Sequence, residues 1–452
     1  MSKIQNLRNL KLGLSRVILL CLIVSVLTCG IVYSTLPTQP FTINRGIYPG
    51  ANTFTIWQEG TEYFAKNAYG IIQYSGTNAS YVINSVINNN HFVFITTGIY
   101  TLTSPLSIAE ISNLTIKGEG INNTILENYG IVKNDGTPAS YITIEDLTID
   151  IKNTVDQTAI NLVGNLSNAV LRRVELKNTN NKFLLHWGTE EQPVNNLLVE
   201  NCIFYDGGLT VSADNAAGDQ DKATQYTTTF RNNLFIKENA VGGAMLTCGG
   251  SGNLLIDGNT FVDYSNNSYG AISLENYFGI IYNVTIINNK AAGFGKQGIA
   301  VGNYETRNGG KAIVTNNICE AIVVKGFEEA IVSNNIVTKG NYGIYFYNTS
   351  YVIVSNNVIR DTNIFNNPSY SDKGCIYAAY AQQLTITNNL MYDTLSQTPY
   401  GTRVSYTTTV WIHGNNFVGP FVYFNASDAG SNTNYLMHDN VVYGAYYENA
   451  TT

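Results

Sequence analysis

The phrase Ile-Val-Ser-Asn-Asn followed by Ile or Val occurs at residues 331–336 and again at residues 353–358. Extended in both directions, it becomes a repeated pattern of an apolar residue, any residue, Asn, Gly or Asp, then Asn, and then an apolar stretch. Successive clear copies are 18 to 32 residues apart, without helical periodicity between them. Such self-similarity predicts a solenoid of strands with about twelve coils. Clear copies begin at Phe230, Ile256, Ile286, Val314, Val332, Val354, Ile386, Ile412 and Met437, and weaker ones at Ile144, Leu171 and Val199.

The repeated asparagines indicate a sharp bend between two strands. Asn tolerates the left-handed backbone region better than any residue except Gly. Asn side chains stacked at the same place in successive coils donate and accept hydrogen bonds along the column as an asparagine ladder. We therefore interpret the Asn pairs as structural. Each unit also contains a Gly followed by alternating apolar residues, as after Gly298 and Gly343, so one unit supplies about three short strands.

Residues 63–126 add an N-terminal pattern. A segment Ser-Gly-Thr-Asn-Ala-Ser at 75–80 precedes an apolar stretch, followed by Gly-Ile-Tyr at 98–100 and Gly-Glu-Gly at 118–120. Together with the repeats over 110–445, this resembles the right-handed parallel β-helix class, the pectate-lyase-like superfamily with its tailspike-type domains. Asn78-Ala79 stands where that family usually has an acidic pair, and Asn is equally suited to begin a helix.

The resemblance implies an all-β fold, a single right-handed parallel β-helix with a short N-terminal capping helix at 80–88. That helix would bury Val82, Ile83, Val86 and Ile87 on one face. The domain boundaries follow: 1–40 a signal peptide or signal anchor, 41–108 the cap and first coil, and 109–452 the repeats. The class contains polysaccharide lyases, glycosidases, phage tailspikes and surface proteins without known activity, so the fold alone does not give the function.

The N-terminus carries an export pattern. Lys3, Arg8, Lys11 and Arg16 precede the apolar, uncharged segment 17–33, which fits either a cleaved signal or a membrane anchor. We expect an extracellular or cell-surface protein. The remaining chain has 21 basic and 32 acidic residues, a net charge of 21 − 32 = −11, which argues against nucleic acid as a partner. Nine N-x-[ST] sequons beyond this segment are acceptor sites for glycosylation in an exported chain.

The remaining cysteines do not form a metal motif. Cys202, Cys248, Cys319 and Cys375 include no C-x-x-C pair, so we expect buried free thiols rather than a zinc site.

The loops that break the regular spacing hold the weak catalytic and metal candidates. The segment at 186–191 and the acidic loop at 205–225 are oversized, and such loops carry function more often than coils do. Two Asp in Gly-Asp-Gln-Asp at 218–221 suit Ca²⁺, a cation that prefers carboxylates, although a solvated loop explains them equally well. The catalytic candidates are His186, Glu190, Glu191, Asp214 and Glu275, and the calcium candidates are Asp214, Asp219 and Asp221.

Aligning the copies predicts two columns on the outside of the rod. The position after the apolar residue is Glu145, Arg172, Glu200, Arg231 and Asp257 in five consecutive coils, which we interpret as a stabilising charge ladder. His413 and His438 share this column near the end, and we expect stacked surface histidines rather than a metal site.

A third column is aromatic and lies in the strands after the Gly signature. Alternation points these side chains outward, where exposed aromatic rings suit stacking against sugars or contact with another protein. The substrate-binding candidates are Tyr345, Tyr347, Tyr377, Arg403 and Tyr423.

Two functions remain open from the sequence. The first is a non-catalytic surface protein that binds extracellular polysaccharide or forms part of the cell envelope. The second is a polysaccharide lyase or glycoside hydrolase acting on an extracellular polysaccharide, with uronic-acid chains as one option. The polygalacturonase motifs are absent, since the chain has no Asp-Asp pair and no Gly-His-Gly, and this favours the first.

The calcium hypothesis predicts that calcium raises the melting temperature, because a ligand that binds only the folded state stabilises it. At a hundredfold excess over Kd the gain is about 2.7 kcal/mol. Replacing Asp219 and Asp221 with Asn should abolish the shift in a thermal melt. A melting curve indifferent to calcium and to chelator would remove the loop as a metal site.

Overall fold

The computed structural model describes residues 52–133, 137–152, 158–162, 166–178, 185–187, 194–205, 211–213, 227–238, 244–247, 252–264, 270–275, 281–292, 294, 297–302, 309–340, 342–362, 374–394, 400–419, 422–426 and 434–444. All of them belong to one compact unit, Tyr48–Thr452. The apolar segment 17–33 lies outside the described residues, and among those described no helix has the length and apolarity needed to cross a membrane.

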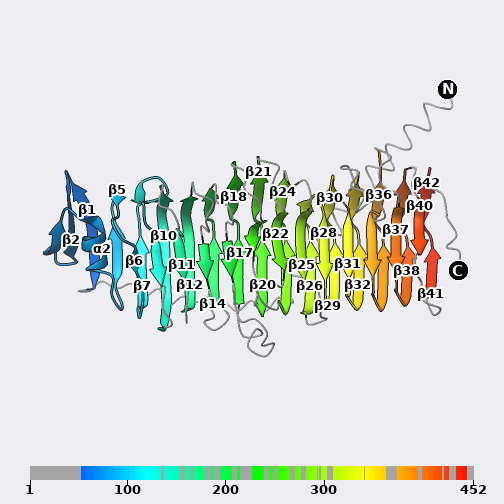
Figure 1. The fold of residues 1–452 in the computed structure, drawn as a ribbon, viewed down its shortest axis with the longest axis horizontal. Helices are drawn as coiled ribbons and strands as arrows, with labels where there is room; N and C mark the ends of the chain where they lie inside the picture. Colours follow the sequence, from blue (N-terminus) through cyan, green and yellow to red (C-terminus); the bar gives the residue numbers. More distant parts are fainter. Residues whose placement is uncertain are drawn as a thin grey trace, which may run out of the picture. The chain divides into compact units, whose positions relative to one another are not determined.

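Each coil contributes three short strands, and every strand pairs in parallel with its counterparts in the coils before and after it (Figure 1). We name the three stacks face one, face two and face three. The chain runs from face three to face one, turns through the asparagine bend into face two, and then enters face three of the next coil. Alternation within each strand sends one side chain to the core and the next to the outside.

The strand bounds are grouped by face. Face one consists of β7 (Ser112–Lys117), β10 (Ala139–Ile151), β12 (Leu166–Asn178), β14 (Val194–Glu200), β17 (Thr227–Arg231), β20 (Asn253–Asp257), β23 (Asn283–Ile287), β26 (Gly309–Thr315), β29 (Phe327–Ser333), β32 (Tyr351–Ser355), β35 (Gln383–Thr387), β38 (Thr409–His413) and β41 (Asn434–His438). Face two consists of β8 (Thr124–Glu127), the second halves of β10 and β12, β15 (Ile203–Tyr205), β18 (Leu234–Lys237), β21 (Thr260–Asp263), β24 (Lys290–Ala292), β27 (Ile318–Cys319), β30 (Ile336–Thr338), β33 (Val358–Arg360), β36 (Leu390–Tyr392), β39 (Asn416–Val418) and β42 (Val441–Tyr443). Face three consists of β6 (Leu106–Ser107), β9 (Ile131–Lys133), β11 (Ile160–Leu162), β13 (Leu185–Trp187), β16 (Val211–Ala213), β19 (Ala244–Thr247), β22 (Gly270–Glu275), β25 (Gln297–Gly302), β28 (Ile322–Lys325), β31 (Ile344–Tyr347), β34 (Ile376–Ala379), β37 (Tyr400–Ser405) and β40 (Val422–Ala426).

The N-terminal end is closed by a small cap. Strands β1 (Thr53–Glu59), β2 (Glu62–Asn67) and β3 (Ile72–Gly76) form an antiparallel sheet. The other edge of β1 pairs in parallel with β4 (Phe92–Ile95), and β5 (Gly98–Thr101) follows β4 in the chain. Helix α2 (Ala79–Asn84) begins after Asn78, whose side chain accepts a hydrogen bond from the backbone N–H of Tyr81. The helix is shorter than the predicted 80–88, but all four predicted apolar residues are buried.

The two asparagines of each bend have different roles. The first residue has a positive φ, as at Asn334 (57°) and Asn356 (57°), with glycine at Gly258 and Gly414. The second residue is buried and forms the ladder. The left-handed conformation predicted for both residues is therefore confined to the first. The ladder residues are Asn233, Asn259, Asn289, Asn317, Asn335, Asn357, Asn389, Asn415 and Asn440.

Each amide of the ladder is satisfied within the core. Asn335 Nδ2 donates to Asn357 Oδ1 at 3.0 Å and to the carbonyl of Val314 at 2.9 Å. Asn335 Oδ1 accepts from both the backbone N–H and Nδ2 of Asn317. Earlier coils place Leu147, Val174 and Cys202 after the left-handed residue, so the ladder begins at Asn233, which accepts from the backbone N–H of Cys202.

The core between the three faces is apolar, and the predicted buried thiols are part of it. Cys202, Cys319 and Cys375 are free and buried, which confirms that prediction for three of the four cysteines; Cys248 lies outside the described residues. Burial raises the pKa of Cys202 and of Cys375 to about 12, so these thiols stay protonated and unreactive at neutral pH.

The ladder predicts a specific stability difference. Asn335 is 1% exposed, so Asn335→Leu should lower the free energy of unfolding by about 1–3 kcal/mol, because it leaves the amide and carbonyl partners unpaired. Asn334→Gly should cost little, since Gly adopts positive φ freely. Ser333→Leu, on the outer side of β29, is the matched control for added size. Equal melting temperatures for Asn335→Leu and Ser333→Leu would contradict the assignment.

Candidate functional site

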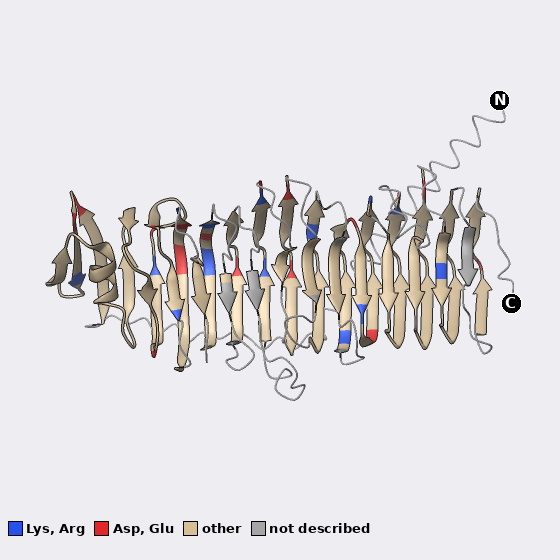
Figure 2. Cartoon of the chain, viewed as in Figure 1, with Lys and Arg blue, Asp and Glu red and all other residues tan. Residues whose placement is uncertain are grey.

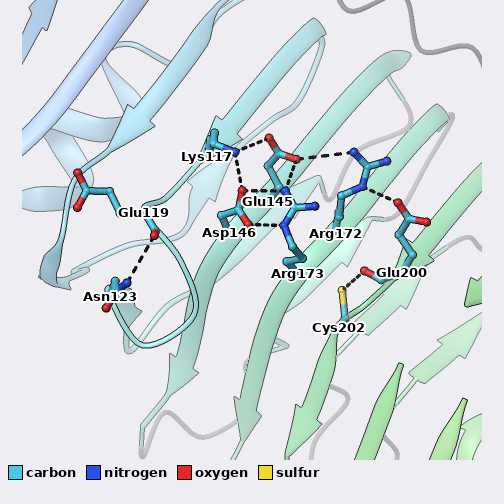
Figure 3. Close-up of polar contacts among 9 residues, drawn as sticks. All are labelled: Lys117, Glu119, Asn123, Glu145, Asp146, Arg172, Arg173, Glu200 and Cys202. Carbon is cyan, nitrogen blue, oxygen red and sulfur yellow. Dashed lines mark hydrogen bonds and ion pairs between the residues drawn. The ribbon is translucent and has the colours of Figure 1, made fainter. Parts of the chain in front are cut away.

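The predicted charge ladder lies on the outer side of face one (Figure 3). Register places Lys117, Glu145, Arg172, Glu200 and Arg231 opposite one another on consecutive strands from β7 to β17. Asp257 on β20 follows Arg231. The order of alternating charges read from the repeats is therefore confirmed.

The left-handed residues beside this column belong to the same network. Arg173 binds Asp146 through two contacts, Nε to Oδ1 at 2.5 Å and Nη2 to Oδ2 at 2.8 Å. Lys117 Nζ lies 3.0 Å from Glu145 Oε1 and 2.5 Å from Asp146 Oδ2. Arg172 Nε lies 2.5 Å from Glu200 Oε1.

The network is electrically balanced, with three cations and three carboxylates. The hydrogen bonds from Arg173, together with Lys117, lower the pKa of Asp146 to about 2. Carboxylates held this firmly by neighbouring cations are typical of a structural network rather than of a general acid or base. Figure 2 shows these charges on the strands of the N-terminal half, while the strands further along are predominantly uncharged.

The same outer column changes character along the rod. After Asp257 it continues as Ile287, Thr315, Ser333, Ser355 and Thr387. The column ends in His413 and His438, whose rings stack with 5.0 Å between their centroids and 2° between their planes. The predicted stacked histidines are confirmed, and no group of three or more metal-ligating side chains occurs within the part of the chain that the structure describes.

The predicted aromatic column lies on the outer side of face three. Register sets Tyr345, Tyr377 and Arg403 opposite one another on β31, β34 and β37. The rings of Tyr345 and Tyr377 stack, with 5.3 Å between their centroids and 4° between their planes. The ring centroid of Tyr347 lies 6.5 Å from that of Tyr345. Strand β40 places Asn425 opposite Arg403, and the side chain of Tyr423 is outside the described set.

Two cations accompany these rings. The Arg403 guanidinium lies 5.7 Å from the ring centre of Tyr377 and 5.4 Å from that of Tyr400. Lys325 Nζ lies 5.8 Å from the ring centre of Tyr345. The described strands β28, β31, β34 and β37 contain no Asp or Glu, and the two cations on them are Lys325 and Arg403.

Two further tyrosines extend this surface. Tyr380 and Tyr406 follow β34 and β37 at the bend where earlier coils have Gly326 and Asn348, and all four residues have positive φ. The two tyrosine rings stack, with 4.8 Å between their centroids and 5° between their planes. Tyr380 is 41% exposed and Tyr406 is 50% exposed. The sequence analysis did not single them out. The sequence did carry a signal for them, because a bulky Tyr stands at a bend position where Gly or Asn is favoured.

The described part of the structure does not show the remaining catalytic and calcium candidates in contact with one another. His186 lies on β13 of face three, opposite Asn161 and Ser212, and Glu275 lies on β22 opposite Gly302, but their side chains are outside the description. Glu190, Glu191, Asp214, Asp219 and Asp221 also lie outside the described residues, so their catalytic and calcium roles stay predictions.

The charge network predicts a pH-dependent contribution to stability. The pKa of Asp146 is lower in the folded chain than its usual 3.8, so its stabilisation is present above about pH 4 and is lost as the pH falls towards about 2. Asp146→Asn, which keeps a residue suited to the left-handed bend, should lower the melting temperature at pH 7. Thermal melts should show the difference from the unmodified protein shrinking between about pH 4 and pH 2. A constant difference across this range would contradict the proposed ion pairing.

The chain was compared with protein families, curated proteins and solved structures. Residues 282–452 match the family described as the right handed beta helix region. No curated protein matches.

Several solved structures are similar in fold. The A-module of the mannuronan C-5 epimerase AlgE4 of Azotobacter vinelandii is 14% identical, with 82% of this chain and 93% of that chain covered and a TM-score of 0.38. The catalytic unit of a GH87 α-1,3-glucanase of Streptomyces thermodiastaticus is 14% identical, with 79% and 67% covered and a TM-score of 0.39. Tailspike protein 3 of bacteriophage CBA120 is 12% identical, with 94% and 70% covered and a TM-score of 0.46.

At these identities the similarity concerns the fold alone. The parallel strand pairing and the family match over residues 282–452 confirm the predicted single right-handed parallel β-helix.

Proposed function

We propose that this chain is an exported, non-catalytic protein that binds an acidic extracellular polysaccharide through the aromatic surface of face three. The surface is formed by Tyr345, Tyr347, Tyr377, Tyr380 and Tyr406, with Arg403 among them. The observation that carries the proposal is the pair of stacked tyrosines at the bend, Tyr380 and Tyr406.

The backbone conformation at this pair supports a binding role. A bulky residue with positive φ is costly, and Asn or Gly would relieve the strain. Residues strained in this way cluster at functional sites, and at this bend two of them also stack on each other while remaining exposed. Exposed rings offer flat apolar faces for the C–H groups of pyranose rings, and Tyr also supplies a hydroxyl for hydrogen bonds.

The local charge supports an acidic ligand. Arg403 lies beside the rings of Tyr377 and Tyr400, and Arg matches the geometry of a carboxylate through two parallel hydrogen bonds. The chain's net charge of −7 would repel a polyanion at long range. The guanidinium group of Arg403 counteracts this repulsion at the place of contact.

The enzyme alternative stays a prediction. A hydrolase needs two carboxylates about 5 to 9.5 Å apart beside the scissile bond. Face three carries its candidate residues, His186 and Glu275, on β13 and β22, several coils away from the tyrosines. A binding function requires only the surface described above.

Replacing the strained tyrosines should separate binding from stability. Tyr380→Asn and Tyr406→Asn should leave the melting temperature unchanged or raised, because Asn favours this backbone conformation. Each should weaken binding of an oligogalacturonate about tenfold, the loss of about 1.4 kcal/mol expected for one stacked ring. Isothermal titration calorimetry on the full chain measures both affinities.

Two controls sharpen the result. Tyr264→Asn removes a tyrosine that is 68% exposed beside β21 on another face, and it should leave binding intact. Arg403→Gln should weaken binding of the oligogalacturonate and reduce its salt dependence. Unchanged affinity in Tyr380→Asn, Tyr406→Asn and Arg403→Gln alike would contradict the proposed function.

A further inference from the structure

An open groove lies on the outer side of face one, across β23 to β35. It is a cavity of about 590 Å³ open to solvent, and its lining includes Tyr282, Lys311, Glu329, Tyr351 and Gln383. The groove begins one coil beyond Asp257 of the charge ladder, and it lies on a different face from the tyrosine surface.

Two parallel rows of side chains run along this part of face one, and the groove is lined by members of both, among them Lys311, Glu329, Ile353 and Thr385. One row is polar and follows the register from Asn283 through Lys311, Glu329 and Tyr351 to Gln383. The other row is mainly apolar and runs along the same strands two residues further on. Its members are Thr285, Ile313, Ile331, Ile353, Thr385 and Trp411.

Three exposed aromatic rings stand along these rows. Tyr351 is 47% exposed, and Trp411, one coil beyond Thr385, is 44% exposed. Tyr282 lies over Gly310 of the next coil, where an added Cβ would come within 3.1 Å of its ring. Register sets Tyr282 one residue before the row of Tyr351 and Trp411 two residues after it. The three rings therefore form an oblique line across face one, over β26, β32 and β38, and successive rings are two coils, about 10 Å, apart along the rod axis at the usual strand spacing. Two linked pyranose units span a similar distance.

The polar groups suit an uncharged ligand. Among the described residues lining the groove the charged ones are Lys311, Glu328 and Glu329. Lys311 Nζ pairs with Glu329 Oε1 at 2.9 Å, and Glu328 leaves the groove slightly negative. An acidic sugar would be repelled here, whereas hydroxyl groups both donate to carboxylates and amides and accept from the ammonium group.

We propose that this groove is a second glycan-binding site, specific for a neutral, β-1,4-linked hexose chain that crosses face one obliquely along the line of the three rings. Such a chain is a flat ribbon that presents ring faces at regular intervals, so every second sugar stacks on Tyr282, Tyr351 or Trp411. The side chains of Lys311, Glu329 and Gln383 beside this line hydrogen-bond the hydroxyl groups. The site does not depend on the tyrosine surface of face three.

The experiment is calorimetric titration of the full chain with cellohexaose, mannohexaose and hexagalacturonate. We expect at least one neutral hexasaccharide to bind, with Tyr351→Ala and Trp411→Ala each weakening its affinity about tenfold or more. Tyr141→Ala is the matched control, because Tyr141 is 55% exposed on β10 of the same face, many coils away. It should leave the affinity unchanged.

The two sites are distinguished by crossing ligands and variants. Tyr406→Asn should affect the acidic hexasaccharide and leave the neutral one unaffected, whereas Trp411→Ala should do the reverse. Failure of one site therefore does not imply failure of the other. Circular dichroism melts of each variant establish that a lost affinity is not lost folding.

Three results would overturn the proposal. The first is that neither neutral hexasaccharide binds more tightly than about 1 mM. The second is an equal loss of affinity in Tyr141→Ala and Tyr351→Ala. The third is a dimer in sedimentation velocity that Tyr351→Ala or Trp411→Ala dissociates, which would make this face a contact between two copies of the chain.

Discussion

The buried asparagine column fixes the alignment of the coils, and the outer surfaces depend on that alignment. Each ladder amide has two donors and one acceptor oxygen inside an apolar core, and all of them bond to the neighbouring coils. A coil displaced by one residue would leave these groups unpaired, at a cost of about 1–3 kcal/mol for each buried group. Because the register is therefore fixed, residues at equivalent positions form straight rows on the outside, about 5 Å apart.

The side chains in these rows differ from face to face and along the rod, although every coil is built on the same repeat. Near the N-terminal end, the outer column of face one is a balanced network of ion pairs around Glu145 and Asp146. Further along, the outer surface of face one is aromatic and near neutral around Tyr351. Face three carries tyrosines beside Arg403 and Lys325. The rod thus presents two aromatic surfaces with different polar neighbours, and we propose that they bind two kinds of sugar chain.

Much of this arrangement was predictable because it repeats. The Asn pairs predicted the coils, and counting outward from them placed Glu145, Arg172 and Glu200 in one column and Tyr345, Tyr377 and Arg403 in another. The separate roles of Asn334 and Asn335 were missed, although the repeat carries the signal: Gly258, Gly414 and Asp439 replace Asn at the first position, whereas the second position is Asn in every clear copy. Tyr380 and Tyr406 were missed because they interrupt the repeat instead of following it. The groove was missed because each coil supplies only two or three of its residues, and successive coils are 18 to 32 positions apart in the chain.

The most direct measurement is hydrogen–deuterium exchange of the full chain with and without hexagalacturonate. If the tyrosine surface of face three binds an acidic polysaccharide, exchange should slow in β31, β34 and β37 and at the bends that hold Tyr380 and Tyr406. The backbone N–H of Tyr380, which donates to the carbonyl of Ser405, is within this region. Exchange should stay unchanged in β7, β10 and β12, where the ion pairs already satisfy the charged side chains. Unchanged exchange in β34 and β37 at saturating ligand would contradict the account.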